Sequence, residues 1–147
     1  MTVRIYIDTN VWLDFFGGER RREKYLLRDE FAAQLFARVE SGEYEMVLSD
    51  HLLKQLEYFV QDRRALDALL QRLAPHTLTT RATKADKDLA HSRVPKDHDD
   101  KYTGATDFED MLHYGIAERT RCVYYVTCDY ELQFSGAVKI VASKDIC

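Results

Sequence analysis

Four aspartates stand where carboxylates could act together on one substrate. Asp8 ends the apolar run "RIYI", and Asp129 closely follows the apolar run "VYYVT". Asp107 and Asp110 are three residues apart in "DFEDMLHYGIA", a spacing that puts both on one face of a helix. Carboxylates that gather in one place repel each other unless cations neutralise them, and an oxygen-rich set suits Mg²⁺ or Mn²⁺. Such ions activate water and stabilise charge on a phosphodiester, so these residues predict metal-dependent hydrolysis.

Each aspartate by itself also has an ordinary structural explanation. An Asp beside a Thr is typical of a turn or a helix N-cap, which would account for Asp8. Acidic residues complement the positive start of a helix, which would account for Asp107 and Asp110, and Asp129 could be a turn residue. The run "DHDD" at 97–100 is more typical of a solvated loop than of a metal site. The shared position of four carboxylates therefore carries the interpretation.

The elements that must position these residues follow from the spacing of apolar residues. Short β-branched and aromatic runs predict strands at 3–7, 45–49, 76–80, 122–127 and 137–142. Apolar residues at helical spacing predict helices around 31–39, 52–60, 66–73, 84–91 and 108–116. Thr83 and Asp86 are spaced as an N-terminal cap of the helix at 84–91. This alternation predicts one α/β domain, residues 1–147, whose mainly parallel sheet is covered on both faces.

The carboxyl ends of parallel strands meet at one edge of the sheet, where ligands gather. Asp8 and Asp129 would both emerge at that edge. A helix that precedes a parallel strand begins at the same edge, so Asp107 and Asp110 would join them. The sequence therefore predicts an acidic cluster there.

Composition limits the classes of partner. The chain carries 21 basic and 25 acidic residues, a net charge of −4, which excludes a polybasic nucleic-acid binder. No apolar run approaches the roughly 20 residues that span a bilayer, and no signal peptide is evident, so we expect no membrane partner. Three cysteines without metal-binding spacing favour the reducing cytoplasm.

The order of motifs resembles that of PIN-domain ribonucleases, which include VapC-type toxins of toxin–antitoxin pairs. The resemblance covers residues 3–142 and rests on four segments: "IYIDTNVWLDFF", "VLSDHLLKQLEYF", "TDFEDMLHYGIAE" and "VYYVTCDYEL". It implies a three-layer α/β/α sandwich that cleaves RNA with Mg²⁺ or Mn²⁺, commonly as a homodimer, and a cognate antitoxin as a partner.

The resemblance also implies roles for individual residues. Asp8, Asp110 and Asp129 match the family's metal-binding acids, with Asp107 as a companion. Three neighbouring polar residues match accessory positions: Thr9 and Asn10 as turn residues that orient the first acid, and Thr127 beside the last one.

One position departs from the family pattern. The family usually has a Glu in the helix after the second strand, where this chain aligns Gln55 and carries Glu57 two residues later. Residues advance by about 100° in a helix, so these two side chains are about 200° apart and only one can face the acidic edge. The alignment favours Gln55, whereas charge favours Glu57.

Three function classes remain open. The first is a metal-dependent endoribonuclease, to which the arginines Arg20, Arg21 and Arg22 could add phosphate contacts unless they form a solvated patch. The second is a catalytically weak or inactive PIN-like module that binds RNA or protein. The third is a phosphatase or a receiver-type phosphoacceptor. Against the third class, "DTN" lacks the second acid of a D-x-D motif, and no acidic pair precedes the first strand.

Overall fold

The computed structural model describes residues 2–17, 26–94, 108–128 and 136–146. Several residues that the sequence singled out lie outside these ranges: Asp107, Asp129, the run at 97–100, and Arg20, Arg21 and Arg22. Their roles remain predictions.

A five-stranded parallel sheet forms the centre of the molecule. Its strands are β1 (Val3–Ile7), β2 (Tyr44–Ser49), β3 (Thr77–Thr80), β4 (Tyr124–Thr127) and β5 (Lys139–Ala142). Their order is β3-β2-β1-β4-β5, so the chain moves outward from β1 to β3 and then returns to the other side of β1. The strand order therefore reverses between β1 and β4, and open α/β sheets bind ligands in the crevice at such a point.

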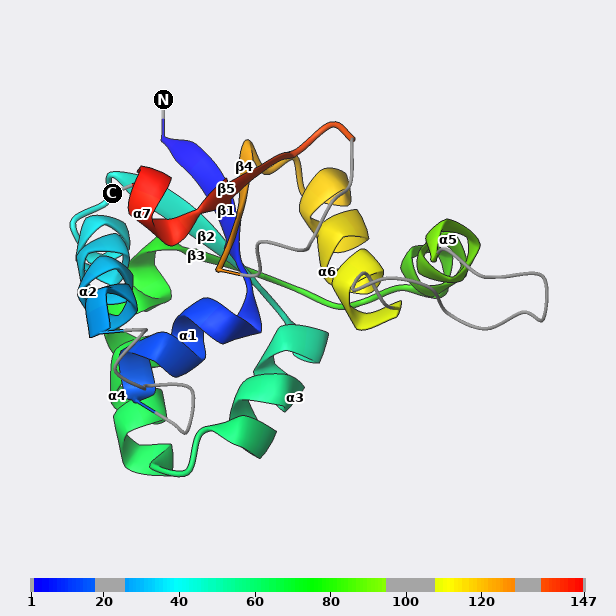
Figure 1. Ribbon diagram of the computed structural model, residues 1–147. Coiled ribbons are helices and arrows are strands. Elements are labelled where there is room, and N and C mark those ends of the chain that lie inside the picture. Colours follow the sequence, from blue (N-terminus) through cyan, green and yellow to red (C-terminus); the bar gives the residue numbers. More distant parts are fainter. Residues whose placement is uncertain (1, 18–25, 95–107, 129–135, 147) are drawn as a thin grey trace.

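Helices cover both faces of the sheet (Figure 1). One layer contains α1 (Thr9–Phe16), α2 (Leu26–Glu40), α4 (Arg63–Leu73) and α7 (Ser143–Ile146). The opposite layer contains α5 (Lys84–Arg93) and α6 (Phe108–Arg119), while α3 (Asp50–Phe59) lies beyond the carboxyl end of β2. A short 3-10 helix, Ala74–His76, joins α4 to β3. The predicted three-layer α/β/α sandwich is confirmed. None of the helices in the described ranges has the length and apolar character needed to cross a membrane.

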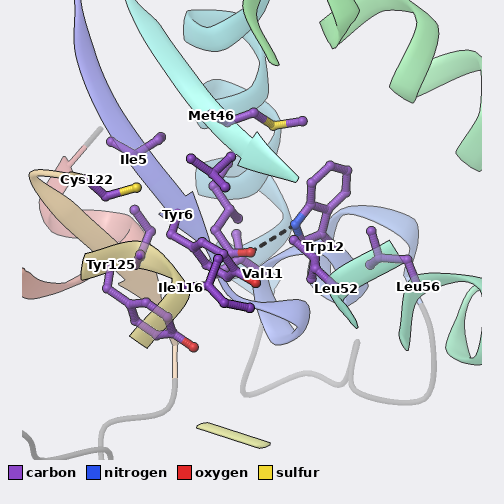
Figure 2. Packing of buried hydrophobic residues seen from close by; sticks show 14 of the residues in the cluster. Ile5, Tyr6, Val11, Trp12, Met46, Leu52, Leu56, Ile116, Cys122 and Tyr125 are labelled. Carbon is purple, nitrogen blue, oxygen red and sulfur yellow. Dashed lines mark hydrogen bonds between the residues drawn. The ribbon is translucent and has the colours of Figure 1, made fainter. Parts of the chain in front are cut away.

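The core is built around β1, which is paired on both sides. Alternate side chains of β1 point to opposite faces of the sheet. Tyr6 stacks on Tyr125 at a ring distance of 5.6 Å, whereas Ile5 and Ile7 face the layer of α1 and α2. In that layer, Trp12 packs on Phe36 at 4.6 Å and donates its indole N–H to the Ile7 carbonyl at 3.1 Å (Figure 2). This hydrogen bond ties α1 to the last residue of β1.

Helix α1 replaces the turn that Thr9 and Asn10 were expected to form. Asp8 is its N-cap, and Gly17 ends it with a left-handed φ of 72° and an N–H that donates to the Leu13 carbonyl. Asp and Gly are preferred at these two ends of a helix. The N-cap alternative for Asp8 and the placement of that residue at the strand end are therefore both correct.

An ion pair joins the two helices of the second layer. Asp86 forms the predicted capping box with Thr83, and its carboxylate also accepts hydrogen bonds from the Arg119 Nε at 3.0 and 3.1 Å. Burial raises the pKa of Asp86, but the hydrogen bonds from Arg119 and Thr83 outweigh it and hold this pKa below its ordinary value of 3.8.

We expect Asp86→Asn to lower the free energy of unfolding by about 1–3 kcal/mol at pH 7, because it removes the charge that Arg119 binds. Because the pKa of Asp86 is lower in the folded state, its ionised carboxylate stabilises the fold fully at pH values above 3.8. This stabilisation is lost as the pH falls through the folded-state pKa. Urea unfolding at pH 7 and near pH 3 should therefore show a smaller difference between variant and wild type in acid. A difference that is constant with pH would contradict the assignment.

Candidate active site

Hydrogen bonds from neighbouring residues hold Asp8 at the end of β1. Its Oδ1 accepts the Thr9 N–H at 2.8 Å, and its Oδ2 accepts the Thr127 hydroxyl at 3.0 Å and the Asn10 amide at 3.3 Å. Asp8 is only 6% exposed, and a buried carboxylate needs such hydrogen bonds to offset its lost hydration. The carboxylate is therefore fixed in direction before any ligand arrives.

Asn10 connects the ends of β1 and β4. Its Nδ2 donates to the Thr127 hydroxyl at 3.0 Å, and its Oδ1 accepts the Cys128 N–H at 3.2 Å. The Asp8 N–H adds a bond of 2.9 Å to the Val126 carbonyl. Both sides of the strand-order reversal are thus joined directly at the carboxyl edge.

Asp110 lies in the first turn of α6 and approaches the same region. Burial raises the pKa of Tyr125 well above its ordinary value, and the negative charges of Asp8 and Asp110 add to the rise. Both carboxylates therefore act on one buried phenol of β4. Their placement together at one edge of the sheet stays a prediction, which this shared effect on Tyr125 supports.

Helix α3 turns Gln55, and not Glu57, toward this edge. The Gln55 Oε1 accepts the Thr9 hydroxyl at 2.5 Å and contacts His113 Nε2 at 2.7 Å, while its Nε2 donates to Glu109 at 3.2 Å. Glu57 is exposed and pairs with Arg63 at 3.1 Å. Since an amide oxygen has two lone pairs, Gln55 Oε1 is fully engaged by Thr9 and His113.

A buried hydrogen-bonded chain behind Gln55 was not anticipated from the sequence. The Leu52 N–H donates to Ser49 Oγ at 3.0 Å, Ser49 meets the Tyr6 hydroxyl at 2.8 Å, and Tyr6 meets His113 Nδ1 at 2.5 Å. Because Gln55 Oε1 can only accept, His113 must donate from Nε2 and accept from Tyr6 at Nδ1. His113 follows Asp110 by three residues, and this spacing along one helix face was the available signal.

Glu109 links α3 to α6 at the mouth of this chain. Its carboxylate receives the Gln55 amide and also contacts His51 Nε2. The ring of His51 lies 4.7 Å from that of His113. Helices α3 and α6 are therefore joined by polar side chains at the first turn of α6, the turn that contains Asp110.

A family model described as PIN domain matches residues 4–131. The chain belongs to the PIN-domain family. No curated protein sequence matches it.

The fold of this PIN domain also occurs in a solved toxin structure. The crystal structure of Mycobacterium tuberculosis VapC20, described as a toxin that cleaves the sarcin–ricin loop, superposes with a TM-score of 0.58. The two sequences are 19% identical, and the match covers 92% of this chain and 98% of the other. At this identity the likeness establishes a common fold.

The donor set of the PIN domain can be compared with the needs of a divalent cation. Asp8 and Asp110 supply hard carboxylate oxygens whose charges both act on one buried phenol, and neighbouring carboxylates favour a cation that neutralises them. Within the described ranges, no three Asp, Glu, His or Cys side chains form a group that could hold a metal ion. The described residues thus fit part of a metal site, and further ligands would have to come from elsewhere in the chain.

His113 should remain neutral over the physiological range. Burial, with a smaller contribution from His51, lowers the pKa of His113 to about 3. We expect its ring nitrogens, followed by NMR from pH 5 to 8, to keep the Nε2–H form, whereas the same ring in urea titrates near 6.5. Since only the unfolded state gains a proton on this residue between pH 6.5 and 3, acidification should also destabilise the fold. Titration of His113 in the folded protein between pH 5 and 8 would contradict the hydrogen-bonded chain.

Proposed function

We propose that this PIN domain is a metal-dependent endoribonuclease. One observation supports the proposal: the charges of Asp8 and Asp110 both raise the pKa of Tyr125 in β4, beside the point where the strand order reverses, in a chain of the PIN-domain family. Asp8, Asp110, Asp129 and Asp107 would hold Mg²⁺ or Mn²⁺. When bound, such an ion supplies an activated water and neutralises charge that develops on the RNA phosphodiester.

Residues around Asp8 would orient the metal-binding carboxylates. The Thr9 N–H and the Thr127 hydroxyl hold the Asp8 carboxylate in one direction, so little reorganisation is needed when substrate arrives. Asn10 binds the Cys128 N–H, which directly precedes Asp129 in the chain. Gln55 supports Thr9 from the α3 side and leaves ligation to the carboxylates.

A toxin of a toxin–antitoxin pair is the physiological role that we propose. The fold shared with VapC20 supports it, and an antitoxin and a second copy of the chain would then be partners. The reducing cytoplasm is the expected compartment, and three cysteines without metal-binding spacing suit it.

A weakly active or inactive PIN-like module that binds RNA or protein is the second candidate. It is favoured by Gln55, a neutral residue where the family usually carries a Glu, and by the negative net charge. Binding of RNA without cleavage in either metal would support this reading.

We expect Asp8→Asn or Asp110→Asn to lower cleavage of labelled single-stranded RNA at least about 100-fold, because the lost ligand contributes several kcal/mol to charge stabilisation. The assay compares Mg²⁺, Mn²⁺ and a chelator. Asn at position 8 keeps an oxygen for the Thr9 N–H, so the helix cap and the circular dichroism spectrum should be retained.

Metal binding provides a readout that does not depend on activity. Mg²⁺ or Mn²⁺ at millimolar concentration should raise the melting temperature of the wild type by mass action and leave the Asp8→Asn, Asp110→Asn double variant unchanged. Wild-type turnover in either single variant would remove that carboxylate from the site, and equal metal stabilisation of the double variant would argue against the metal centre.

Gln55→Glu tests the unusual position in α3. A second carboxylate oxygen would then face Glu109 across the 3.2 Å that the Gln55 amide now bridges. We expect the metal-free variant to lose about 1–3 kcal/mol of stability from this repulsion, and Mg²⁺ or Mn²⁺ to raise its melting temperature more than that of the wild type.

Glu57→Gln is the matched control on the same helix. In the described part of the chain Glu57 pairs with the exposed Arg63, so stability should change by less than about 0.5 kcal/mol, with no change in the metal response. A larger metal response in Gln55→Glu is the decisive sign. If Glu57→Gln instead weakened metal binding, the orientation of α3 would be wrong.

A further inference from the structure

Two aromatic side chains at the end of α3 have no place in the core. Tyr58 is 82% exposed and Phe59 is 52% exposed, the highest values among the large apolar side chains that the structure describes. Their rings meet edge to face, 4.9 Å apart at 89°. The two rings therefore contact each other without stacking, and the face of the more exposed ring, Tyr58, stays open to solvent.

The position of this pair, Tyr58 and Phe59, relates it to the acidic edge. Tyr58 and Phe59 follow Gln55 by three and four residues, so they lie on the same side of α3, one turn farther along. Gln55 in turn is bonded to Thr9, the neighbour of Asp8. The pair therefore lies one helical turn beyond the residue of α3 that contacts the neighbour of Asp8.

A protein interface needs more apolar surface than this pair offers. Two aromatic side chains bury at most about 150–250 Å² each, whereas a stable interface takes roughly 800 Å² per partner. The other large apolar side chains that the structure describes as exposed are Leu78, Leu89 and Val123, in three other segments of the chain. Around the pair, α3 and α4 present the exposed charged residues Lys54, Glu57 and Arg63.

Single-stranded RNA fits these constraints. An acidic edge in a chain of net charge −4 repels phosphates wherever bound cations do not neutralise it, so a contact that does not depend on charge would add to the RNA affinity. Stacking of a base on an aromatic ring provides one and tolerates any base. Lys54, four residues before Tyr58 and exposed on the same side of α3, is placed to contact a phosphate of the same nucleotide.

We infer that Tyr58 and Phe59 form a base-stacking subsite for single-stranded RNA beside the acidic edge. The inference rests on the proposed ribonuclease function and adds to it a contact for a nucleotide that flanks the cut phosphate. Tyr58 provides the open ring face, Phe59 supports it from the side, and Lys54 contacts the phosphate backbone.

The test measures binding of fluorescently labelled oligoadenylate and oligouridylate by anisotropy. The full-length Asp8→Asn protein is used throughout, so that no RNA is cleaved. Tyr58→Ala should weaken binding about 10-fold, equivalent to about 1.4 kcal/mol, and Tyr58→Phe should retain the affinity. Tyr58→Lys separates stacking from charge: it should weaken binding although it adds a positive charge. Leu89→Ala, an exposed apolar residue of α5, is the matched control and should have no effect.

Each outcome has a defined meaning. Weaker binding in Tyr58→Ala and Tyr58→Lys, with a raised KM and nearly unchanged kcat for Tyr58→Ala in the otherwise wild-type enzyme, supports the subsite. Unchanged affinity in Tyr58→Ala, or tighter binding in Tyr58→Lys, overturns it. If Tyr58→Ala changes the sedimentation velocity of the protein but not its RNA affinity, the subsite is overturned as well and the pair is assigned to a protein interface. Wild-type protein that neither binds nor cleaves RNA overturns the proposed function itself.

Discussion

The burial of one carboxylate organises this end of the molecule. Asp8 loses most of its hydration at the tip of β1, and the structure compensates with the Thr9 N–H, the Asn10 amide and the Thr127 hydroxyl. Those donors come from the first turn of α1 and the last residue of β4. Helix α1, strands β1 and β4 and the candidate site therefore depend on each other. A shift of any of them would leave the Asp8 carboxylate without some of its hydrogen bonds.

A second, uncharged network stabilises the opposite side of the edge. The Tyr6 hydroxyl and the neutral His113 carry hydrogen bonds from β2 to Gln55 without any buried charge. Such a fully satisfied chain orients each member, because every donor has one acceptor in reach. It also explains how a neutral Gln55 is accommodated: its oxygen is occupied by protein donors, and its amide group binds Glu109.

The two networks give the two sides of the edge different chemical groups. The side formed by β1 and β4 presents a carboxylate whose direction is set in advance, which suits a hard cation. The side formed by α3 presents an amide, a histidine and, one turn away, exposed rings. Negative substrates are repelled by the first side unless cations neutralise it, and the second side offers contacts that do not depend on that charge.

The local patterns along the chain were sufficient for the strands, for the capped helix at Thr83 and for the position of Asp8 at a strand end. These features depend on neighbouring residues, whose periodicity and capping chemistry are visible in the sequence. Helix α1 was missed, although Asp8 and Gly17 occupy its two ends, because Thr9 and Asn10 also suit a turn.

The remaining features depend on residues that are distant in the sequence. Asn10 and Thr127 are 117 positions apart, and Gln55 and His113 are 58 apart. Periodicity placed Gln55 and Glu57 on different sides of α3, but the Thr9 hydroxyl and the His113 ring show which of them faces the edge. A hydrogen bond has a range of about 3 Å, so its partners become known only when the packed sheet and helices bring them together.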